Sequence, residues 1–435
     1  MSNYLKKAIK TPESDEAETQ EIVKRILEDV QKNGEDAYLR HYGAKFKDWS
    51  GKLILTKEEI AEAGSKIPEQ IKDDLKFAYE QVYGFAVKQR ESLSEFETEL
   101  YPGVTLGQRL IPCNCAGCYI PGGRFAHAAS AIMSIATAKA AGVPFVVAVS
   151  PSHDGKSINP AILYAISLCN PDVFMMMGGT HAIAAMAYGH FTGKPADVIV
   201  GPGNRFVAEA KRILFGQIGI DVFAGPTESL ILADETADPY FVAIDLMSQA
   251  EHGYDSPVWL VTDSKHLAGK VIELMPKVIA DLPDPTVAEA SWRDYGEVVL
   301  CENREEMAQV SDTYAAEHVQ VLAEELDWWL NRLTNYGSLF LGEGCTVPYG
   351  DKTTGTNHIL PTKKAARYSG GLSVGKFIKT VTYQKVTKEA NRKIAAVASR
   401  ISRIEGMEGH ARAADVRLRK YFPEEKFDFK VYEPE

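Results

Sequence analysis

Short apolar runs alternate with alanine-rich segments through the middle of this chain, and no other feature constrains its fold as strongly. The runs have the length and content of buried strands, and they lie at 144–150, 172–179, 196–204 and 229–234. Segments 127–142 and 204–216 have helical patterns. Such alternation is typical of a parallel sheet covered by helices. Several runs end in a glycine-containing turn that opens onto a helix, which is where open α/β sheets bind ligands.

A second set of apolar runs follows the first, again with helical segments between its members. These runs lie at 256–262, 295–301, 317–323 and 337–343. Residues 1–100 and 384–421 have helical periodicity instead. We therefore expect an α/β protein with two sheet layers between helical ends.

Charge and hydropathy exclude several classes of partner. The chain has 48 basic and 59 acidic residues, and its formal net charge of −11 disfavours a general binder of nucleic acid or anionic membranes. No apolar run reaches the roughly 18 residues of a membrane span. The first residues, MSNYLKKAIKTPESDEAE, lack the apolar core of a secretory signal. We expect a cytoplasmic protein with no nucleic-acid or membrane partner.

The cysteines predict packing and not a metal site. Six cysteines without a secretory signal are expected to be reduced thiols. Cys113, Cys115 and Cys118 have C-x-C-x-x-C spacing, but no second Cys or His pair lies nearby to complete four ligands. Their neighbours are apolar, and free cysteine packs like a small hydrophobe.

The stretch LMSQAEHGYDSPVW, residues 247–260, ends an apolar helix pattern on polar side chains. His252 follows Gln249 by three positions, so the two side chains share one face of a helix. Two interpretations are open at this point. Either this is a polar helix end that faces water, or both side chains bind one ion.

Glu317 and His318 form an adjacent acid–imidazole pair directly before an apolar run. These two groups are the best suited to proton transfer near neutral pH. Neighbours on a strand point to opposite faces, so both can serve one site only at an edge or a turn. The alternative is a surface carboxylate beside a half-buried histidine.

Two more places carry candidate ligands. The loop 350–361 holds Asp351 and His358 between a strand and a proline, and such loops often carry binding residues. His410 follows Glu405 by five residues in a late helix, where an exposed helix position is the alternative. Spacing alone does not join these places to the helix end. Together they offer mixed oxygen and nitrogen donors that suit a divalent metal such as zinc, namely Gln249, His252, Asp351 and His410.

From about residue 20 to 420 the chain resembles the histidinol dehydrogenase family. The resemblance rests on the order and spacing of YIPGGR, GPGNRFVAEAKR, AGPTES, SQAEHGYDS, AAEH, GDKTTGTNHILPT and EGMEGH. Further stretches are similar to the branch of sulfopropanediol 3-dehydrogenases, namely GQRLIP, WRDYGEVVLC, DWWLNRLTNYGSLFLGE, ARYSGGLSVGKFIKT and RISRIEGMEGHARAAD.

The resemblance implies a fold and a division of the chain. The fold is α/β, with two incomplete Rossmann-like, doubly wound domains, helical arms at both ends and an intertwined homodimer with shared active sites. The implied parts are an N-terminal arm (1–24), a first α/β domain with most catalytic residues (25–118 and 229–372), a second, NAD-binding domain (119–228) and a C-terminal helical arm that contributes to the partner's site (373–435).

The resemblance also implies roles for individual residues. One Zn²⁺ per subunit is held by Gln249, His252, Asp351 and His410, the last from the partner subunit. Glu317 and His318 are the acid–base pair. Thr227, His358 and Glu405 bind the substrate, and Tyr119, His181 and Asn204 contact NAD⁺. Two positions depart from the family, which usually has Gln at 181 and Ser at 227. No G-x-G-x-x-G occurs in the chain, so NAD⁺ is implied by the resemblance alone.

The implied reaction oxidises a small hydroxyalkyl substrate, a primary alcohol, to a carboxylate in two hydride transfers. The branch points to (R)-2,3-dihydroxypropane-1-sulfonate, which gives (R)-3-sulfolactate, and Arg124, Arg293 and Arg367 are candidates to bind the sulfonate. Two alternatives stay open, namely oxidation of L-histidinol to L-histidine on the same residues and a non-catalytic metal-binding homologue.

Overall fold

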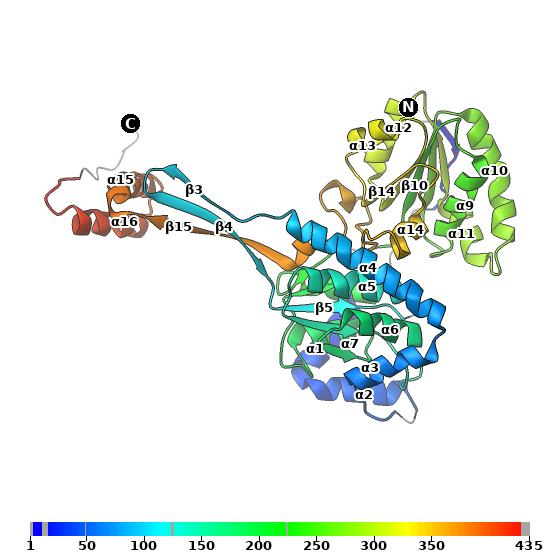
Figure 1. Cartoon of the computed structure of the whole chain (residues 1–435), viewed down its shortest axis with the longest axis horizontal. Coiled ribbons are helices and arrows are strands. Elements are labelled where there is room, and N and C mark those ends of the chain that lie inside the picture. Colours follow the sequence, from blue (N-terminus) through cyan, green and yellow to red (C-terminus); the bar gives the residue numbers. More distant parts are fainter. Residues whose placement is uncertain (1–2, 11–15, 48, 123–125, 223–224, 428–435) are drawn as a thin grey trace. The chain divides into compact units, whose positions relative to one another are not determined.

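The computed structural model describes residues 3–10, 16–47, 49–122, 126–222 and 225–427 (Figure 1). The chain divides into two compact units. The first contains Met1–Arg90 and Pro112–Phe377, and the second contains Glu91–Ile111 and Ile378–Glu435. No helix of the described residues is long and apolar enough to cross a membrane.

One six-stranded sheet of the first unit has β5 (Cys115–Tyr119) near its centre, and every residue of this strand is buried. The order is β2-β7-β6-β5-β8-β9, with all pairs parallel except β2 with β7. The other strands are β2 (Ile54–Leu55), β6 (Phe145–Val149), β7 (Val173–Met175), β8 (Val198–Val200) and β9 (Gly219–Ile220). Helices cover both faces of such a sheet, which explains why its strands are continuous apolar runs.

The helices that follow β5 alternate with the strands of this sheet along the chain. They are α5 (Ala128–Ala140), α6 (Pro160–Cys169), α7 (Gly179–Tyr188) and α8 (Arg205–Leu214). Four N-terminal helices precede them, namely α1 (Glu16–Asn33), α2 (Glu35–Lys45), α3 (Lys57–Glu62) and α4 (Glu69–Glu91). Of these, α1 packs on α7 and α8, and α3 packs on α6. The chain order reverses on either side of β5, and such a switch point is where ligands bind in open α/β sheets.

The second six-stranded sheet has the order β1-β12-β11-β10-β13-β14. Its strands are β1 (Asn3–Lys6), β10 (Ser229–Ala233), β11 (Val258–Thr262), β12 (Glu297–Leu300), β13 (His318–Leu322) and β14 (Ser338–Leu341). Only β1, at one edge, runs antiparallel to its neighbour. The helices are α9 (Pro239–Ala250), α10 (Lys265–Ala280), α11 (Thr286–Tyr295), α12 (Arg304–Tyr314), α13 (Leu326–Arg332) and α14 (Val347–Lys352).

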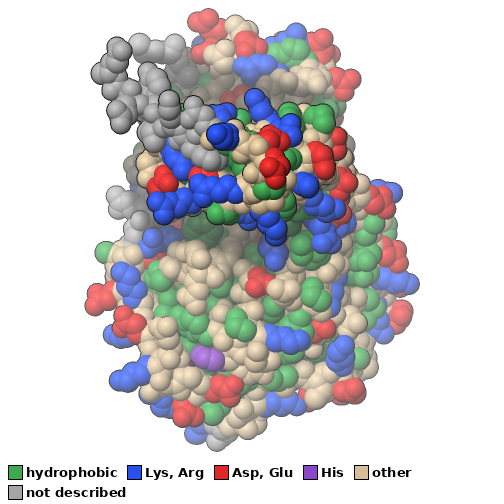
Figure 2. Space-filling view, turned by 90° about the vertical axis from the view of Figure 1, so that its left-hand side faces the viewer, with side chains coloured by type: hydrophobic (Ala, Val, Ile, Leu, Met, Phe, Trp, Pro, Cys, Tyr) green, Lys and Arg blue, Asp and Glu red, His purple; other side chains and the backbone are tan. Residues whose placement is uncertain are grey.

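The second unit combines a three-stranded sheet with a helix pair. The strands β3 (Phe96–Tyr101), β4 (Val104–Pro112) and β15 (Ile378–Val386) have the order β15-β4-β3. Helices α15 (Lys388–Ile404) and α16 (Glu408–Tyr421) pack together. Between them Arg403 donates to Asp415 at 2.7 Å, and Asp415 is buried. Lys and Arg side chains are frequent on the face that Figure 2 presents.

The expected α/β class is confirmed, and each apolar run singled out in the sequence contains a strand. The division into domains differs from the expected one. Residues 25–118 were assigned to the sheet of 229–372, whereas α1 and α3 pack on helices of the other sheet and β2 joins it. The described part of the expected N-terminal arm includes β1, which pairs with β12. Helical periodicity shows which face of a helix is apolar but not which sheet that face covers.

Candidate active site

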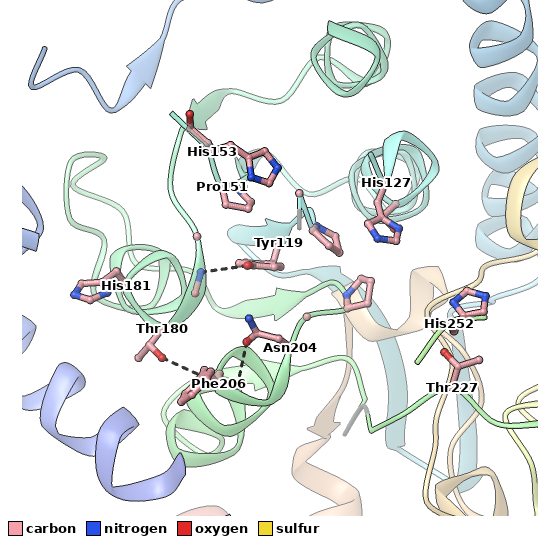
Figure 3. Close-up of a pocket in the computed structure, with 18 of the residues that line it drawn as sticks. Tyr119, His127, Pro151, His153, Thr180, His181, Asn204, Phe206, Thr227 and His252 are labelled. Atoms are coloured by element: carbon pink, nitrogen blue, oxygen red, sulfur yellow. Dashed lines mark hydrogen bonds between the residues drawn. The ribbon is translucent and has the colours of Figure 1, made fainter. Parts of the chain in front are cut away.

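A cavity of about 870 Å³ in the first unit collects residues from both six-stranded sheets. The first sheet contributes the carboxyl ends of its strands, including Tyr119 at the end of β5 and the turn before α8. The second sheet contributes the amino ends, with Thr227 shortly before β10 and His318 as the first residue of β13. In Figure 3, Thr227 and His252 lie on one side of the cavity, and Thr180 and His181 lie on the other.

Tyr119 and Asn204 organise two of the turns at the first sheet. The Tyr119 hydroxyl accepts a hydrogen bond from the Gly179 amide at 3.2 Å, at the beginning of α7. Asn204 is the N-cap of α8, and its Oδ1 accepts from the amides of Phe206 and Val207 at 3.1 and 3.2 Å. These two of the three residues predicted to contact the cofactor therefore each accept from amides at the beginning of a helix that starts at the cavity.

The turn between β8 and α8 requires glycine at position 201. Its φ is +117°, and a Cβ atom there would lie 2.0 Å from the Tyr119 carbonyl oxygen. A buried ion pair between Lys211 and Asp221 holds this turn. Lys211 donates to the Gly201 carbonyl at 3.0 Å, and Asp221 accepts from the Gly201 amide at 2.7 Å. The backbone N–H and C=O of Gly201 are thus both held by buried side chains.

His181, the third residue predicted to contact the cofactor, is buried at the far end of the cavity. Its ring stacks on that of His41 from α2, with the two centroids 3.7 Å apart and the planes at 20°. Burial lowers the pKa of His181 to about 4, so the imidazole is neutral at physiological pH. A neutral imidazole retains one hydrogen-bond donor and one acceptor, and the amide of glutamine likewise offers both an N–H donor and an acceptor oxygen.

Glu317 and His318 lie together at the entrance to β13. The Glu317 carboxylate accepts from the Glu228 amide at 3.0 Å, while His318 Nδ1 lies 3.2 Å from the Glu228 carbonyl oxygen. With Nδ1 as the donor, the lone pair is on Nε2. This atom is buried, has no hydrogen-bond partner among the described residues, and lies 3.8 Å from a carboxylate oxygen of Asp351. A distance of 3.8 Å is too long for a direct hydrogen bond, so Asp351 acts on the ring through its charge.

The acid–base pair has shifted pKa values with distinct causes. Burial raises the pKa of Glu317 to about 8, because no water solvates its charged form. Burial alone would lower the pKa of His318, but the charges of Glu317 and Asp351 outweigh it and raise the pKa to about 8. Groups this close titrate as a pair, and together they can take up and release protons near neutral pH.

Three of the four predicted metal ligands belong to the first unit. Gln249 lies at the end of α9, and its buried Oε1 has no hydrogen-bond partner among the described residues. Desolvation lowers the pKa of His252 to about 4, although its side chain is open to the cavity. Burial would raise the pKa of Asp351, but the charges of His318 and Lys352 outweigh it and hold it below its usual range. An unpaired amide oxygen, a neutral imidazole and a carboxylate are the forms that ligate zinc.

His410 and Glu405 lie in the second unit, in α16 and at the end of α15. Accordingly, the described residues form no group of three or more His, Cys, Asp or Glu side chains that could hold a metal. Of the expected ligands in the first unit, only His252 and Asp351 are of these types. The expected set is therefore incomplete without the second unit's histidine.

His358 is held on both ring nitrogens in the same cavity. Nε2 lies 2.9 Å from the Ser130 hydroxyl, and Nδ1 lies 2.9 Å from the Asp351 carbonyl oxygen. Burial lowers its pKa to about 4. This neutral ring lines the same cavity as Thr227 and His318, and its expected contact with the substrate stays a prediction.

Sequence reasoning missed Glu228 and Lys352. Glu228 lies between Thr227 and β10, and its carboxylate accepts from the Lys363 amide at 2.8 Å. Burial raises its pKa to about 7. Lys352 lines the cavity next to Asp351. Each residue is adjacent to a predicted site residue, and that adjacency was the available signal. Of the arginines considered for a sulfonate, Arg293 and Arg367 are not among the residues that line this cavity, and Arg124 lies outside the described residues.

Comparisons with known proteins show which chains are similar to this one over almost its whole length. The family profile described as histidinol dehydrogenase matches residues 9–418. The sulfopropanediol 3-dehydrogenase of Ruegeria pomeroyi is 56% identical over 427 residues, which cover 98% of each chain. A histidinol dehydrogenase homolog of Pelagibacter ubique is 55% identical, over 96% of this chain and 98% of the relative. The crystal structure of histidinol dehydrogenase from Elizabethkingia anophelis superimposes with a TM-score of 0.89 at 31% identity, over 95% of each chain.

Proposed function

Because the chain belongs to the histidinol dehydrogenase family and is a dehydrogenase, we propose that it uses zinc and NAD⁺ to oxidise a primary alcohol to a carboxylate. The proposed substrate is (R)-2,3-dihydroxypropane-1-sulfonate and the product (R)-3-sulfolactate. The choice of substrate is supported by 56% identity to a sulfopropanediol 3-dehydrogenase along almost the whole chain.

The observation that carries the proposed chemistry is that candidate metal ligands and a candidate acid–base pair line one cavity. The donors His252 and Asp351 line the same cavity as the acid–base pair of Glu317 and His318. Alcohol oxidation needs a site that orients the hydroxyl and a base that removes its proton. Side chains suited to both requirements line one cavity.

Zinc fits the side chains at this end of the cavity. Gln249, His252 and Asp351 would hold it, and the buried, unpartnered Oε1 of Gln249 supports this assignment. When bound, zinc supplies Lewis acidity that orients and polarises the substrate oxygen. We assign the fourth ligand to His410 of a partner subunit.

A homodimer is the partner arrangement that this assignment requires. Helices α15 and α16 leave apolar side chains exposed in the single chain, namely Ile401, Ile404, Met407 and Val416. Clustered apolar side chains of this kind mark protein–protein contacts. Their position around Glu405 and His410 in the sequence supports a contact that would bring both residues to a partner's site.

NAD⁺ fits the other end of the cavity, near Tyr119, His181 and Asn204. The turn at Gly201 has no room for a side chain, and α7 and α8 begin at the cavity, where the positive end of each helix dipole favours phosphate groups. When bound, NAD⁺ supplies the acceptor for the hydride that leaves the carbinol carbon in each of the two oxidations.

The protein's own residues handle the protons. His318, held by Glu228 at Nδ1, accepts the hydroxyl proton at Nε2 in the first oxidation. Glu317 then takes a proton from the water that adds to the aldehyde, and the hydrate is oxidised to the carboxylate. His358 and Thr227 hold the substrate in place. Two titratable groups are needed because the first proton must leave before the second is taken.

The test compares purified protein on two alcohols, with identification of the product by mass spectrometry. We expect 2,3-dihydroxypropane-1-sulfonate to be converted to sulfolactate with NADH formation. Turnover of L-histidinol to L-histidine instead would keep the site assignments and overturn the substrate. Absence of NADH with both alcohols, in protein that contains zinc, would favour a non-catalytic metal-binding homologue.

A further inference from the structure

Positive charge is scarce along the cavity. Among the described residues that line it, the Lys and Arg residues are Lys45 and Lys352. Lys45 lies at the end of α2, on the same helix as His41, which stacks on His181 at the cofactor end. Lys352 is the last residue of α14 and follows Asp351 directly, at the end where the acid–base pair lies.

The ammonium group of Lys352 lies beside Asp351, in the cavity that the acid–base pair lines. Its side chain is partly exposed to solvent. Its Nζ lies 3.7 Å from a carboxylate oxygen of Asp351, and 55% of its side chain is exposed. Burial lowers the pKa values of His127, His252 and His358, and the charge of Lys352 lowers each of them further. The ammonium therefore acts on three imidazoles that line the same part of the cavity.

Carboxylates also line this end of the cavity, so an ammonium group beside them favours an anionic substrate. Glu317 and Asp351 line the cavity, and the amide of the buried Glu228 donates to the Glu317 carboxylate. A sulfonate is ionised at every pH at which the protein is folded. In the proposed substrate, C2 and C3 lie between the carbon that bears the sulfonate and the hydroxyl oxygen that is oxidised. Charge-assisted hydrogen bonds are the strongest that a protein offers to such a group.

We propose that Lys352 is the residue that selects the substrate's anionic headgroup, by pairing its ammonium with the sulfonate. This inference rests on the proposed function. It replaces the arginines considered from sequence, since Arg293 pairs with Asp294 and Arg367 donates to the Lys364 carbonyl.

The experiment compares two substrates that differ only in the headgroup. 2,3-Dihydroxypropane-1-sulfonate carries the sulfonate, and propane-1,2-diol is the same diol without it. For Lys352→Met we expect KM for the sulfonate to rise about ten-fold or more, since hydrogen bonds to charged groups contribute about that much. We expect kcat to stay close to the native value, and kcat/KM for propane-1,2-diol to stay unchanged. Lys352→Arg keeps the charge and should recover part of the affinity.

Two controls separate headgroup recognition from damage to the site. Lys45→Met removes the same charge from the other end of the cavity and should leave KM for the sulfonate unchanged at saturating NAD⁺. Propane-1-sulfonate, which has no hydroxyl to oxidise, should compete with the substrate in the native protein and about ten-fold more weakly in Lys352→Met. Zinc content of the Lys352 variants is measured alongside, because Asp351 is adjacent.

The outcomes distinguish this inference from the proposed function. If the native protein oxidises the sulfonate and Lys352→Met has the native KM, the role of Lys352 is overturned and the proposed function stands. Equal losses on both diols, with zinc lost, would also overturn it, because Lys352 would then support Asp351 and not the headgroup. If the native protein does not oxidise the sulfonate, the proposed function fails and this role fails with it.

Discussion

The carboxylate of Glu317 and Nδ1 of His318 lie 3.6 Å apart, although the residues are consecutive in the chain. Consecutive side chains within a strand point to opposite faces. Here β13 begins at His318, so Glu317 precedes the strand and its side chain can turn to the same side. The peptide of Glu228 holds both groups, with its amide toward Glu317 and its carbonyl toward His318. One backbone unit thereby fixes an acid–base pair.

The pKa of His318 predicts how activity depends on pH. The ring must be neutral to accept the substrate's proton, and its pKa is raised to about 8. Below this value the ring is protonated and inactive, so kcat/KM should rise with pH and level off above about 8. In Glu317→Gln the negative charge that helps to raise the pKa of His318 is absent. The pH at which kcat/KM for NADH formation in the first oxidation rises should then be lower. An unchanged pH of this rise would exclude an effect of the Glu317 charge on the pKa of His318.

Glu317→Gln should also separate the two oxidations. His318 remains as the base for the first step, while the group that activates water for the second is lost. Removal of a general base costs about 10²- to 10⁴-fold in rate. Rapid mixing with one equivalent of substrate should therefore show one NADH formed quickly and the second slowly, with aldehyde accumulating between them. Equal slowing of both phases would assign Glu317 to a role common to both steps.

His252→Ala should remove zinc and abolish turnover while the fold is retained. The side chain is open to the cavity, so its loss leaves little unfilled space in the core. Metal content and thermal unfolding measure the two effects separately. His266→Ala, an exposed histidine in α10, is the matched control and should keep both zinc and activity. Native zinc content in His252→Ala would refute the ligand assignment.

Gly201→Ala should weaken NAD⁺ binding and destabilise the protein. The new Cβ would lie 2.0 Å from the Tyr119 carbonyl oxygen, so the turn before Asn204 must shift. Gly193 also has a positive φ, of +66°, but a Cβ there meets nothing within 4 Å. Gly193→Ala should cost only the roughly 1–2 kcal/mol of left-handed strain. Denaturant unfolding and NAD⁺ titration of both variants test the difference, and equal losses would contradict the steric argument.

The strands could be predicted from sequence because buried parallel strands are continuous apolar runs. The turn at Gly201–Asn204 could also be placed, since it follows such a run and begins a helix. The second half of the site could not be found this way. Thr227 and His318 lie at the amino ends of their strands and His252 lies just after α9, where no turn motif marks a ligand site.

Bringing separate segments together was also beyond the sequence pattern. More than 60 positions separate Gln249 from Glu317, and only the fold places their segments near one cavity. The family resemblance supplied that connection. Lys352 follows Asp351 directly in the loop 350–361, but a lysine beside a carboxylate is common on protein surfaces and does not by itself indicate a sulfonate contact.

The most direct test of the account is the yield of NADH per molecule of 2,3-dihydroxypropane-1-sulfonate, measured by absorbance before and after zinc is removed by a chelator. The account predicts two NADH per substrate, loss of this yield on removal of zinc, and recovery when zinc is returned. A yield of one NADH would contradict oxidation to the carboxylate. A yield that persists without metal would contradict the role given to Gln249, His252 and Asp351.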